Sequence, residues 1–274
     1  MTIGAALVLA GALVALFGST LVWLGHEWWT DEYYAHGPLV PLVSAFFFRR
    51  ATRRWGEFRS SARSFSAGTA CIAAGVAAHL LAADRRAPYL SAGALIVILG
   101  GLVLALRGGS ALRQAAFPLG FLAAAAPLSF VDSLSQPLQI VTARWAAGLA
   151  LAVGLPVSQT GAQLSLTGCS LVVGAPCSGL RSIITFLSLV ALLLYITQGV
   201  WAAKVALALL AVPIALAGNV LRVTSLLAVA QMWGADAALH YYHTAFGFVF
   251  YLLALALLLT LAGVLGCRDI RSDI

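Results

Sequence analysis

Charged residues are scarce in this 274-residue chain: it has 16 Lys and Arg and 9 Asp and Glu, together 9% of the sequence. Hydrophobic residues make up 62%, and the mean hydropathy of +0.98 argues against a water-soluble globular domain. The apolar runs are unbroken and close to the ~20 residues that span a bilayer, unlike the alternating pattern of porin strands. The sequence therefore predicts an all-α polytopic membrane protein.

Cysteine is also rare. The four residues Cys71, Cys169, Cys177 and Cys267 form no Cys-x-x-Cys pair and have no histidine at metal-ligand spacing. We therefore expect no metal and no other cofactor. No basic residue precedes the first apolar run, 3–24, and no small-residue cleavage site follows it, so we expect a retained helix and not a signal peptide.

The net charge of +7 comes largely from one segment, 49–64. Loops rich in Lys and Arg stay in the cytoplasm during membrane insertion, so we expect this loop on the inner side. That placement explains the basic composition without nucleic acid, and the sequence lacks the interleaved aromatic and basic residues of a nucleic-acid surface. The six arginines of the loop are Arg49, Arg50, Arg53, Arg54, Arg59 and Arg63.

We expect about eight membrane spans in one domain over 1–274, because no internal repeat or low-complexity linker divides the chain. With the N-terminus inside, the acidic loop 25–36 lies outside, whereas Lys204 and the tail with Arg268 and Arg271 lie inside. The expected spans are residues 3–24, 37–48, 65–83, 89–106, 114–130, 178–197, 205–228 and 244–266.

Two segments between the fifth and sixth spans need separate treatment. Segment 133–155 is apolar but carries Arg144 near its middle, which is costly in hydrocarbon, so we expect an interfacial or re-entrant helix on the outer side. Segment 157–174 alternates polar and apolar residues around Gly161 and Gly168, which predicts a small β-hairpin. Bare strands are not tolerated in lipid, so the hairpin is expected in the outer aqueous layer.

The hairpin leads into Ala-Pro-Cys-Ser-Gly-Leu-Arg-Ser, 175–182, at the start of the sixth span. A helix N-terminus favours the thiolate of Cys177, and Arg181 adds positive charge. The N–H groups of Ser178 and Gly179 are candidate donors to an oxyanion. The alternatives are that Cys177 only fills space or forms a disulfide with Cys169.

The seventh span carries Asn219 and Arg222, which are three residues apart and share a helix face. Arg222 lies about 26 Å along the helix from Val205, near the outer end, which is also the level expected for Cys177. An arginine that only anchors a helix end is the simpler alternative. Because apolar residues continue beyond Arg222, we favour a side chain that faces a protein-lined polar cavity.

Histidines mark two further outer positions. His240 and His243 open the eighth span, and a histidine has the intrinsic pKa, ~6.5, of a general acid and base. Interfacial anchoring and half of a metal site are the alternatives. His36 enters the second span and is a supporting candidate. A thiol, an arginine and a histidine on one side of the membrane suffice for acyl transfer.

At these residues the chain resembles the exosortase/archaeosortase family of membrane cysteine transpeptidases, and its early segment is similar to the N-terminal half of the bacterial exosortase branch. The resemblance rests on the cysteine motif at 175–182, Asn-Val-Leu-Arg-Val at 219–223, His-Thr-Ala-Phe-Gly at 243–247 and Tyr-Ala-His-Gly-Pro-Leu-Val-Pro at 34–41. Cys169 and Pro176 depart from the usual pattern.

The resemblance implies a multi-pass protein of the bacterial inner membrane whose active site faces the periplasm. Its substrates would be exported proteins with a C-terminal sorting signal: a Pro-Glu-Pro-like motif, a transmembrane helix and a basic tail. Cys177 would be the nucleophile, His243 the general acid and base, and Arg222 the electrostatic stabiliser. The thioacyl-enzyme would pass to an acyl acceptor that the resemblance does not identify.

Two other functions are compatible with parts of the sequence. A small transporter could bind an anionic solute at Arg222 and His243, but it predicts a midplane site and repeated halves, and the sequence shows neither. An assembly factor could use the outer hairpin to bind partners, and an intact disulfide between Cys169 and Cys177 would favour it.

Overall fold

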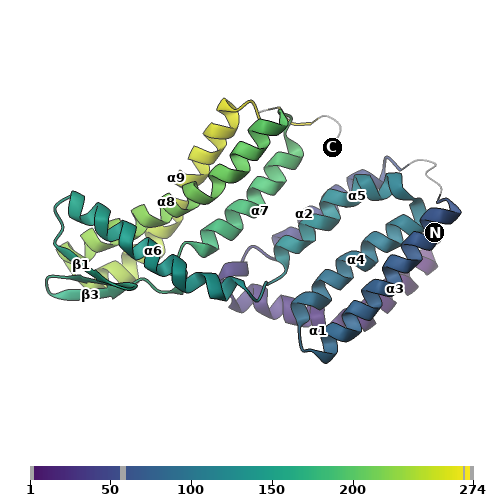
Figure 1. Cartoon of the computed structure of the whole chain (residues 1–274), viewed down its shortest axis with the longest axis horizontal. Coiled ribbons are helices and arrows are strands. Elements are labelled where there is room, and N and C mark those ends of the chain that lie inside the picture. The colour runs from purple at the N-terminus through teal and green to yellow at the C-terminus, as the bar shows by residue number, and fades with distance from the viewer. Residues whose placement is uncertain (1–2, 56–59, 268, 272–274) are drawn as a thin grey trace. The chain divides into compact units, whose positions relative to one another are not determined.

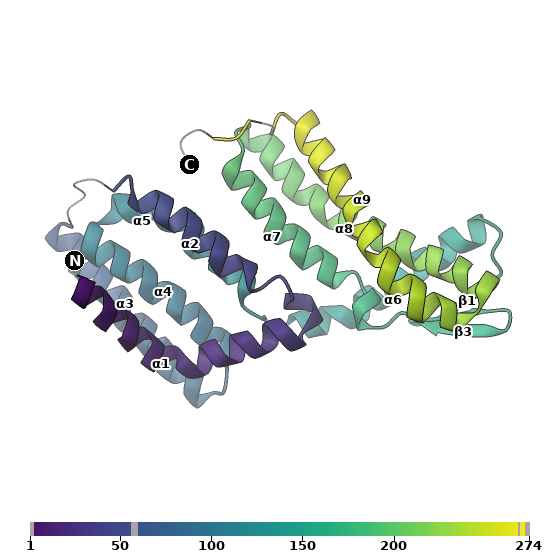
Figure 2. The same ribbon diagram turned by 180° about the vertical axis from the view of Figure 1, so that it is seen from behind.

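A computed structural model describes residues 3–55, 60–267 and 269–271. The chain is mostly helical, and it divides into two compact units, one up to Leu128 and the other from Ser129 (Figures 1 and 2). The membrane class predicted from composition agrees with this architecture. The expectation of one functional domain over 1–274 stays a prediction, and Arg59 and Arg268 lie outside the described residues.

The first unit is a helical bundle in which α3 and α4 form the closest pair. A Cβ on Gly68 of α3 would collide with the backbone of Ala105 of α4, so the missing side chain allows the close approach that small residues give membrane helices. The elements are α1 (Ile3–Thr30), η1 (Glu32–Tyr34), α2 (Leu39–Thr52), α3 (Ala62–Asp84), α4 (Pro88–Arg107), α5 (Gly109–Phe121) and η2 (Leu122–Ala125).

A buried polar cluster joins three helices of this unit. The Ser91 hydroxyl of α4 lies 2.6 Å from Thr20 Oγ1 of α1 and 2.6 Å from His79 Nδ1 of α3. All three side chains are buried, and the ring of Phe17 packs on His79 with centroids 4.2 Å apart. Interhelical hydrogen bonds of this kind hold helices together where apolar burial drives association only weakly.

The second unit places three long helices side by side, α7, α8 and α9, in both views (Figures 1 and 2). With 33 residues, α8 is about 50 Å long, well beyond a ~30 Å hydrocarbon core. The elements are α6 (Val131–Ala152), β1 (Val157–Thr160), β2 (Gln163–Leu166), β3 (Cys169–Val172), η3 (Ala175–Cys177), α7 (Leu180–Ile196), α8 (Trp201–Trp233), the π-helical turn η4 (Ala237–Tyr242) and α9 (His243–Val264).

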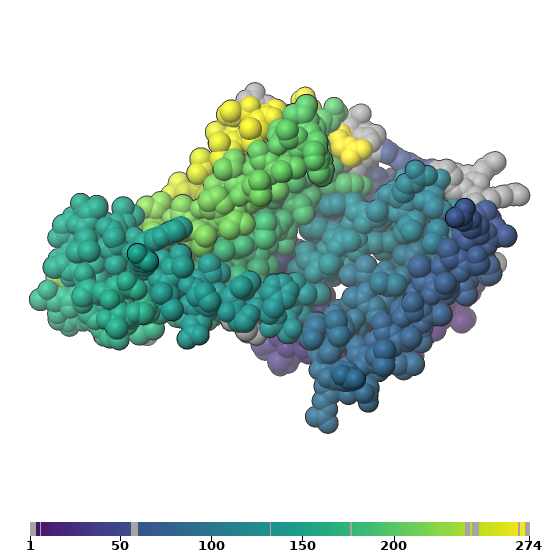
Figure 3. Space-filling model, viewed as in Figure 1, coloured from purple at the N-terminus to yellow at the C-terminus, as the bar shows by residue number. Residues whose placement is uncertain are grey.

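A stripe of buried alanines on α6, including Ala143, Ala146 and Ala150, packs against Leu227 of α8 and Leu164 of β2. Figure 3 shows the atoms of α6 and the strands covering this end of the unit. The sheet has three antiparallel strands in the order β1-β2-β3, so the predicted two-stranded hairpin is wrong in strand number. Both glycine turns reverse the chain, which converts one hairpin into two.

Each expected span falls on a helix, but the count of about eight spans is not confirmed. Among the described residues, five helices are long and apolar enough to cross a membrane: α1, α3, α4, α8 and α9. The shorter apolar α7 has 17 residues, and α2 and α5 have 14 and 13. The expected span 114–130 ends early because the α-helix changes to η2 at Leu122. Segment 133–155 is helical, as α6, and its interfacial position stays a prediction.

Candidate functional site

Cys177 ends the short helix η3, three residues before α7 begins at Leu180. Its backbone N–H donates to the Gly174 carbonyl at 2.9 Å, and its side chain is half-buried. The expected start of the helix at 178 is therefore two residues early, and Cys177 stands just outside the first turn of α7. The helix N-terminus still faces the turn that carries the thiol, so its partial positive charge acts on this segment.

Two polar side chains from other helices hold this turn. Asn219 Nδ2 of α8 donates to the Cys177 carbonyl at 2.7 Å, and Thr142 Oγ1 of α6 donates to the Ser178 carbonyl at 3.1 Å. The two side chains also contact each other, with Asn219 Nδ2 3.4 Å from Thr142 Oγ1. Carbonyls of two successive residues are thus fixed by groups 42 and 36 positions away in the chain.

Gly179 completes the turn between Cys177 and α7. Its φ of +85° lies in the left-handed region, which an L side chain adopts only at a cost. A Cβ there would lie 3.0 Å from Asn219 Nδ2, so the position requires glycine for space as well as for conformation. Within the described part of the chain, the Gly179 N–H donates no hydrogen bond, so it stays a candidate oxyanion donor.

The outcome for Ser178 differs from the prediction. Its N–H donates to the Ala175 carbonyl at 3.2 Å, so the expectation of a free Ser178 N–H is wrong. Its fully buried hydroxyl donates to the same carbonyl at 2.8 Å and accepts from Leu180 N at 3.2 Å. Ser178 therefore shapes the turn, and its hydroxyl accepts from the first N–H group of α7. Further N–H groups for an anion lie in the first turn of α7, at Arg181 and Ser182.

Arg181 is the second residue of α7, and its side chain is exposed. Because Cys177 lies outside α7, Arg181 and Cys177 do not share a face of one helix. Arg181 adds positive charge to the first turn of α7, and its carbonyl accepts from Thr185 Oγ1.

Arg222 lies on α8 one turn beyond Asn219 and faces a cavity of about 20 Å³ between α7, α8 and α9. Asn219, Ser182 and Tyr251 also line this cavity, which has room for about one water molecule. The side chain therefore faces a protein-lined space, as predicted. The Asn219 Oδ1 atom is buried without a hydrogen-bond partner in the described structure.

The backbone of α9 brings the histidine motif to Arg222. A Cβ on Gly247 would lie 3.5 Å from Arg222 Nη1 and 3.8 Å from its Cδ. His243 is the first residue of α9, one helical turn before Gly247, and the π-helical turn η4 directly precedes it. The side chains of His243 and His240 lie outside the described residues, so the role of His243 stays a prediction.

The remaining candidates lie apart from this cluster. His36 belongs to the first unit, where it follows η1, and its ring stacks on Tyr34 with centroids 6.3 Å apart. A supporting role for His36 stays a prediction. Cys169 and Cys177 are both thiols and form no disulfide with each other. Among the described residues, no group of three or more His, Cys, Asp or Glu side chains could hold a metal.

Thr142 is the site residue that the sequence did not reveal. It is fully buried, and it lies in an otherwise apolar stretch of α6 two residues before Arg144. A lone threonine in such a stretch is a weak signal, because its hydroxyl can also bond to its own helix.

Comparison with known proteins shows the family of the chain. The model of the transmembrane exosortase family (Exosortase_EpsH) matches residues 28–260, which include the cysteine turn, Asn219, Arg222 and His243. No curated protein and no solved structure matches the chain. Since the match covers most of the sequence, the chain belongs to the transmembrane exosortase family.

Proposed function

We propose that this chain is a membrane-embedded cysteine transpeptidase that cleaves the C-terminal sorting signal of exported proteins. Membership of the exosortase family suggests a membrane transpeptidase role. The observation that carries the proposal is the hydrogen bond from Asn219 to the Cys177 carbonyl. It joins the cysteine turn to the helix of Arg222, and Arg222 in turn lies against Gly247, one turn from His243.

The chemistry runs in two steps. The Cys177 thiolate attacks the scissile carbonyl carbon, a C–S bond forms, and the carbonyl electron pair moves to oxygen. Collapse breaks the C–N bond, and the leaving amine takes a proton from His243 to leave a thioacyl-enzyme. An acceptor nucleophile then attacks the thioester, gives its proton to His243 and releases the thiolate. Arg222 stabilises the oxyanion or binds a substrate carboxylate.

The substrate would carry a Pro-Glu-Pro-like motif, a transmembrane helix and a basic tail. We place the site at the periplasmic face of the bacterial inner membrane. Lys204 lies near the C-terminal end of α7, where its Nζ donates to the Leu194 and Thr197 carbonyls at 2.7 Å, whereas Cys177 precedes the other end. Basic residues favour the cytoplasmic side, so the opposite end of α7 faces outward.

The test is co-expression with an exported reporter that ends in a Pro-Glu-Pro motif, a transmembrane helix and a basic tail. We expect wild type to release the tail, and Cys177→Ala and Cys177→Ser to leave the reporter unprocessed. Cys169→Ala is the matched control, because it removes a half-buried thiol close in sequence and should retain processing. Processing by Cys177→Ala at the wild-type level would reject the cysteine mechanism.

Two active-site variants separate the remaining roles. We expect Arg222→Gln to lower the single-turnover rate by about 10²–10³-fold, the loss typical of a removed oxyanion donor. His243→Gln should slow thioester formation most for poor leaving amines, whose departure needs a proton. A thioester trapped by hydroxylamine in wild type and absent in Cys177→Ala would identify the intermediate. Solute flux through liposomes that persists in Cys177→Ala would favour the transporter alternative instead.

A further inference from the structure

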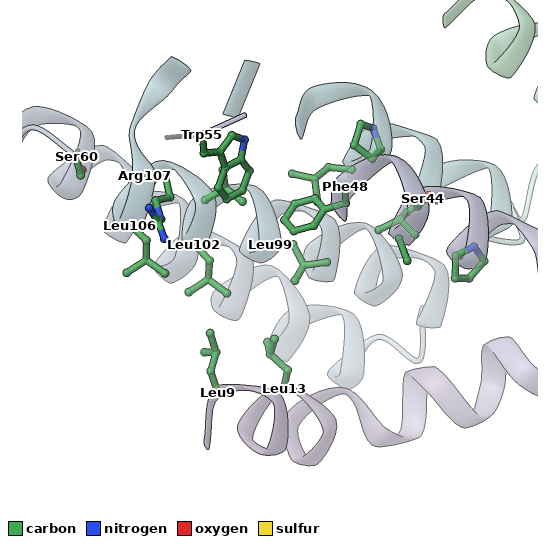
Figure 4. A pocket seen from close by; sticks show the side chains of 16 residues that line it. Leu9, Leu13, Ser44, Phe48, Trp55, Ser60, Leu99, Leu102, Leu106 and Arg107 are labelled. Atoms are coloured by element: carbon green, nitrogen blue, oxygen red, sulfur yellow. The ribbon is translucent and has the colours of Figure 1, made fainter. Parts of the chain in front are cut away.

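A large apolar cavity lies within the first unit, among α1, α2, α4 and α5 (Figure 4). Its volume of about 1010 Å³ is at the upper end of the ~300–1,000 Å³ typical of ligand pockets. Aliphatic and aromatic side chains form most of its wall, including Leu13, Phe48, Leu99 and Leu102. A space of this size and composition suits hydrocarbon chains and not a polar solute.

Polar groups gather at the end of this cavity where α4 finishes. Arg107, the last residue of α4, lines the cavity together with Trp55 and Ser60. Trp55 packs on Val103, one turn before Arg107, and the Ser60 hydroxyl lies 3.5 Å from the Leu104 carbonyl. The cavity is therefore apolar along its length and carries a guanidinium at one end.

One of these groups has an unused hydrogen bond. The Trp55 side chain is 8% exposed, and its Nε1 atom has no hydrogen-bond partner among the described residues. An indole N–H can only donate a hydrogen bond. The Nε1 atom is itself enclosed by protein, so the donor that the cavity wall offers to acceptor oxygens of an occupant is the guanidinium of Arg107.

The charged side chains around this end of the unit favour an anionic occupant. The C-terminal ends of α2 and α4 and the N-terminal ends of α3 and α5 meet at the same end of the unit (Figures 1 and 2). An anion is attracted there, whereas a peptide helix with a basic tail is repelled. The exposed arginines of these ends and of the turn after α2 are Arg49, Arg50, Arg53, Arg54, Arg63, Arg107 and Arg113.

We propose that this cavity binds an anionic phospholipid. Its acyl chains fill the space lined by leucines and Phe48, and its phosphate accepts from the Arg107 guanidinium. A guanidinium matches phosphate oxygens in geometry and charge. The proposal does not depend on the catalytic assignment, because every residue of the cavity belongs to the first unit.

The first experiment measures lipid retention by the full-length protein. Purified protein is equilibrated with mixed micelles of equimolar phosphatidylglycerol and phosphatidylcholine, repurified, and its bound lipid is quantified by mass spectrometry. We expect phosphatidylglycerol to be preferred by about tenfold, the selectivity that about 1.4 kcal/mol gives. Excess inorganic phosphate should not displace the lipid, because it cannot fill the apolar part. Equal retention of the two lipids, or displacement by inorganic phosphate, would overturn the proposal.

Two pairs of variants locate the bound lipid. Arg107→Gln should abolish the preference for phosphatidylglycerol, whereas Arg113→Gln, an exposed arginine at the same end of the unit but not lining the cavity, should keep it. Ala45→Trp narrows the cavity and should reduce total bound lipid, whereas Phe46→Trp, the next residue of α2 but not one that lines the cavity, should not. Equal effects within either pair would contradict the proposal. Unchanged thermal unfolding shows that each variant is folded.

A photo-crosslinking residue at Leu99 distinguishes lipid from protein occupants in native membranes. Leu99 lines the cavity, so an occupant within reach should be captured on illumination. We expect an adduct with the mass of a phospholipid, lost in the Ala45→Trp background. An adduct with the mass of a protein would overturn the proposal and identify a helix as the occupant.

Discussion

The side-chain amide of Asn219 donates a 2.7 Å hydrogen bond to the backbone carbonyl of Cys177, and a Thr142 hydroxyl holds the next carbonyl along the chain. The turn that carries the candidate nucleophile is therefore held from two helices other than α7. A side chain held in this way is fixed before substrate arrives, which is what a reaction that depends on geometry requires.

Asn219→Leu should lower reporter processing more than it lowers stability. It leaves the Cys177 carbonyl without the side-chain donor that holds it, which costs about 1–3 kcal/mol, and it frees the cysteine turn to move. The measurement is the single-turnover rate beside the midpoint of thermal unfolding. Thr224→Val is the matched control, because Thr224 also bonds from α8 to α6 but at Ala146, away from the turn. Equal losses of activity in the two variants would show that Asn219 acts only on packing.

Thr142→Val should reduce processing, and Thr142→Ser should retain it, because serine keeps the hydroxyl that donates to the Ser178 carbonyl. A double-mutant cycle of Thr142→Val with Asn219→Leu measures their coupling. Since the two side chains share one network, we expect an interaction energy of about 0.5–3 kcal/mol in the stability data. Additive effects would mean that the two hydrogen bonds act separately.

Gly179→Ala should be more harmful than Gly154→Ala, although both residues have φ of +85°. The backbone cost of about 1–2 kcal/mol is common to both substitutions. Only at Gly179 would the new Cβ approach Asn219, at 3.0 Å, whereas nothing lies within 4 Å at Gly154. Reporter processing and thermal unfolding of the two variants isolate this contact, and identical behaviour would contradict it.

Gly68→Ala should destabilise the first unit by about 1–3 kcal/mol, because the added Cβ collides with the backbone of α4, which cannot rotate away. Gly93→Ala is the control on a membrane helix, since nothing lies within 4 Å of its position. That substitution should be neutral or stabilising by up to ~1 kcal/mol from helix propensity. Unfolding in detergent by a helix-sensitive probe gives both values. A Gly68→Ala protein as stable as wild type would mean that α3 and α4 pack less closely.

Ser91→Ala should also destabilise the first unit, because it removes the hydroxyl that joins Thr20 and His79. The two buried partners lose a hydrogen bond at once, at about 1–3 kcal/mol each when left unsatisfied. Ser66→Ala serves as the control, since its exposed hydroxyl bonds only within α3. A loss in Ser91→Ala no larger than in Ser66→Ala would argue against the cluster.

The helices could be predicted closely because an unbroken apolar run of membrane length is compatible with few structures other than an α-helix. The span expected at 65–83 corresponds to the helix Ala62–Asp84, and the span expected at 89–106 corresponds to the helix Pro88–Arg107. The start of α7 was predicted two residues early, because the left-handed Gly179 that ends the cysteine turn looks like any other glycine in the sequence. The alternating pattern predicts one hairpin and not a third strand, because it does not show that Thr167 and Gly168 form a second turn.

Most residues of the candidate site could be picked out from the sequence, but the hydrogen bonds that hold the cysteine turn could not. Cys177, Asn219 and Arg222 stand out as polar residues in apolar surroundings. Thr142 owes its role to a contact with Asn219, 77 positions away, and sequence spacing carries no information about such a distance. The prediction of a free Ser178 N–H follows from a helix that starts at 178. In the structure this N–H donates to the Ala175 carbonyl, because a turn precedes the helix.

The length of α8 has a consequence for the lipids around the protein. Arg222 is the 22nd residue of this one continuous helix, so it stands about 32 Å from Trp201, close to the thickness of a hydrocarbon core. Longer acyl tails would submerge the guanidinium and the neighbouring thiol, whereas shorter tails would leave both in the headgroup layer. Processing in reconstituted vesicles should therefore fall as tail length increases, which would make membrane thickness a control on the proposed activity.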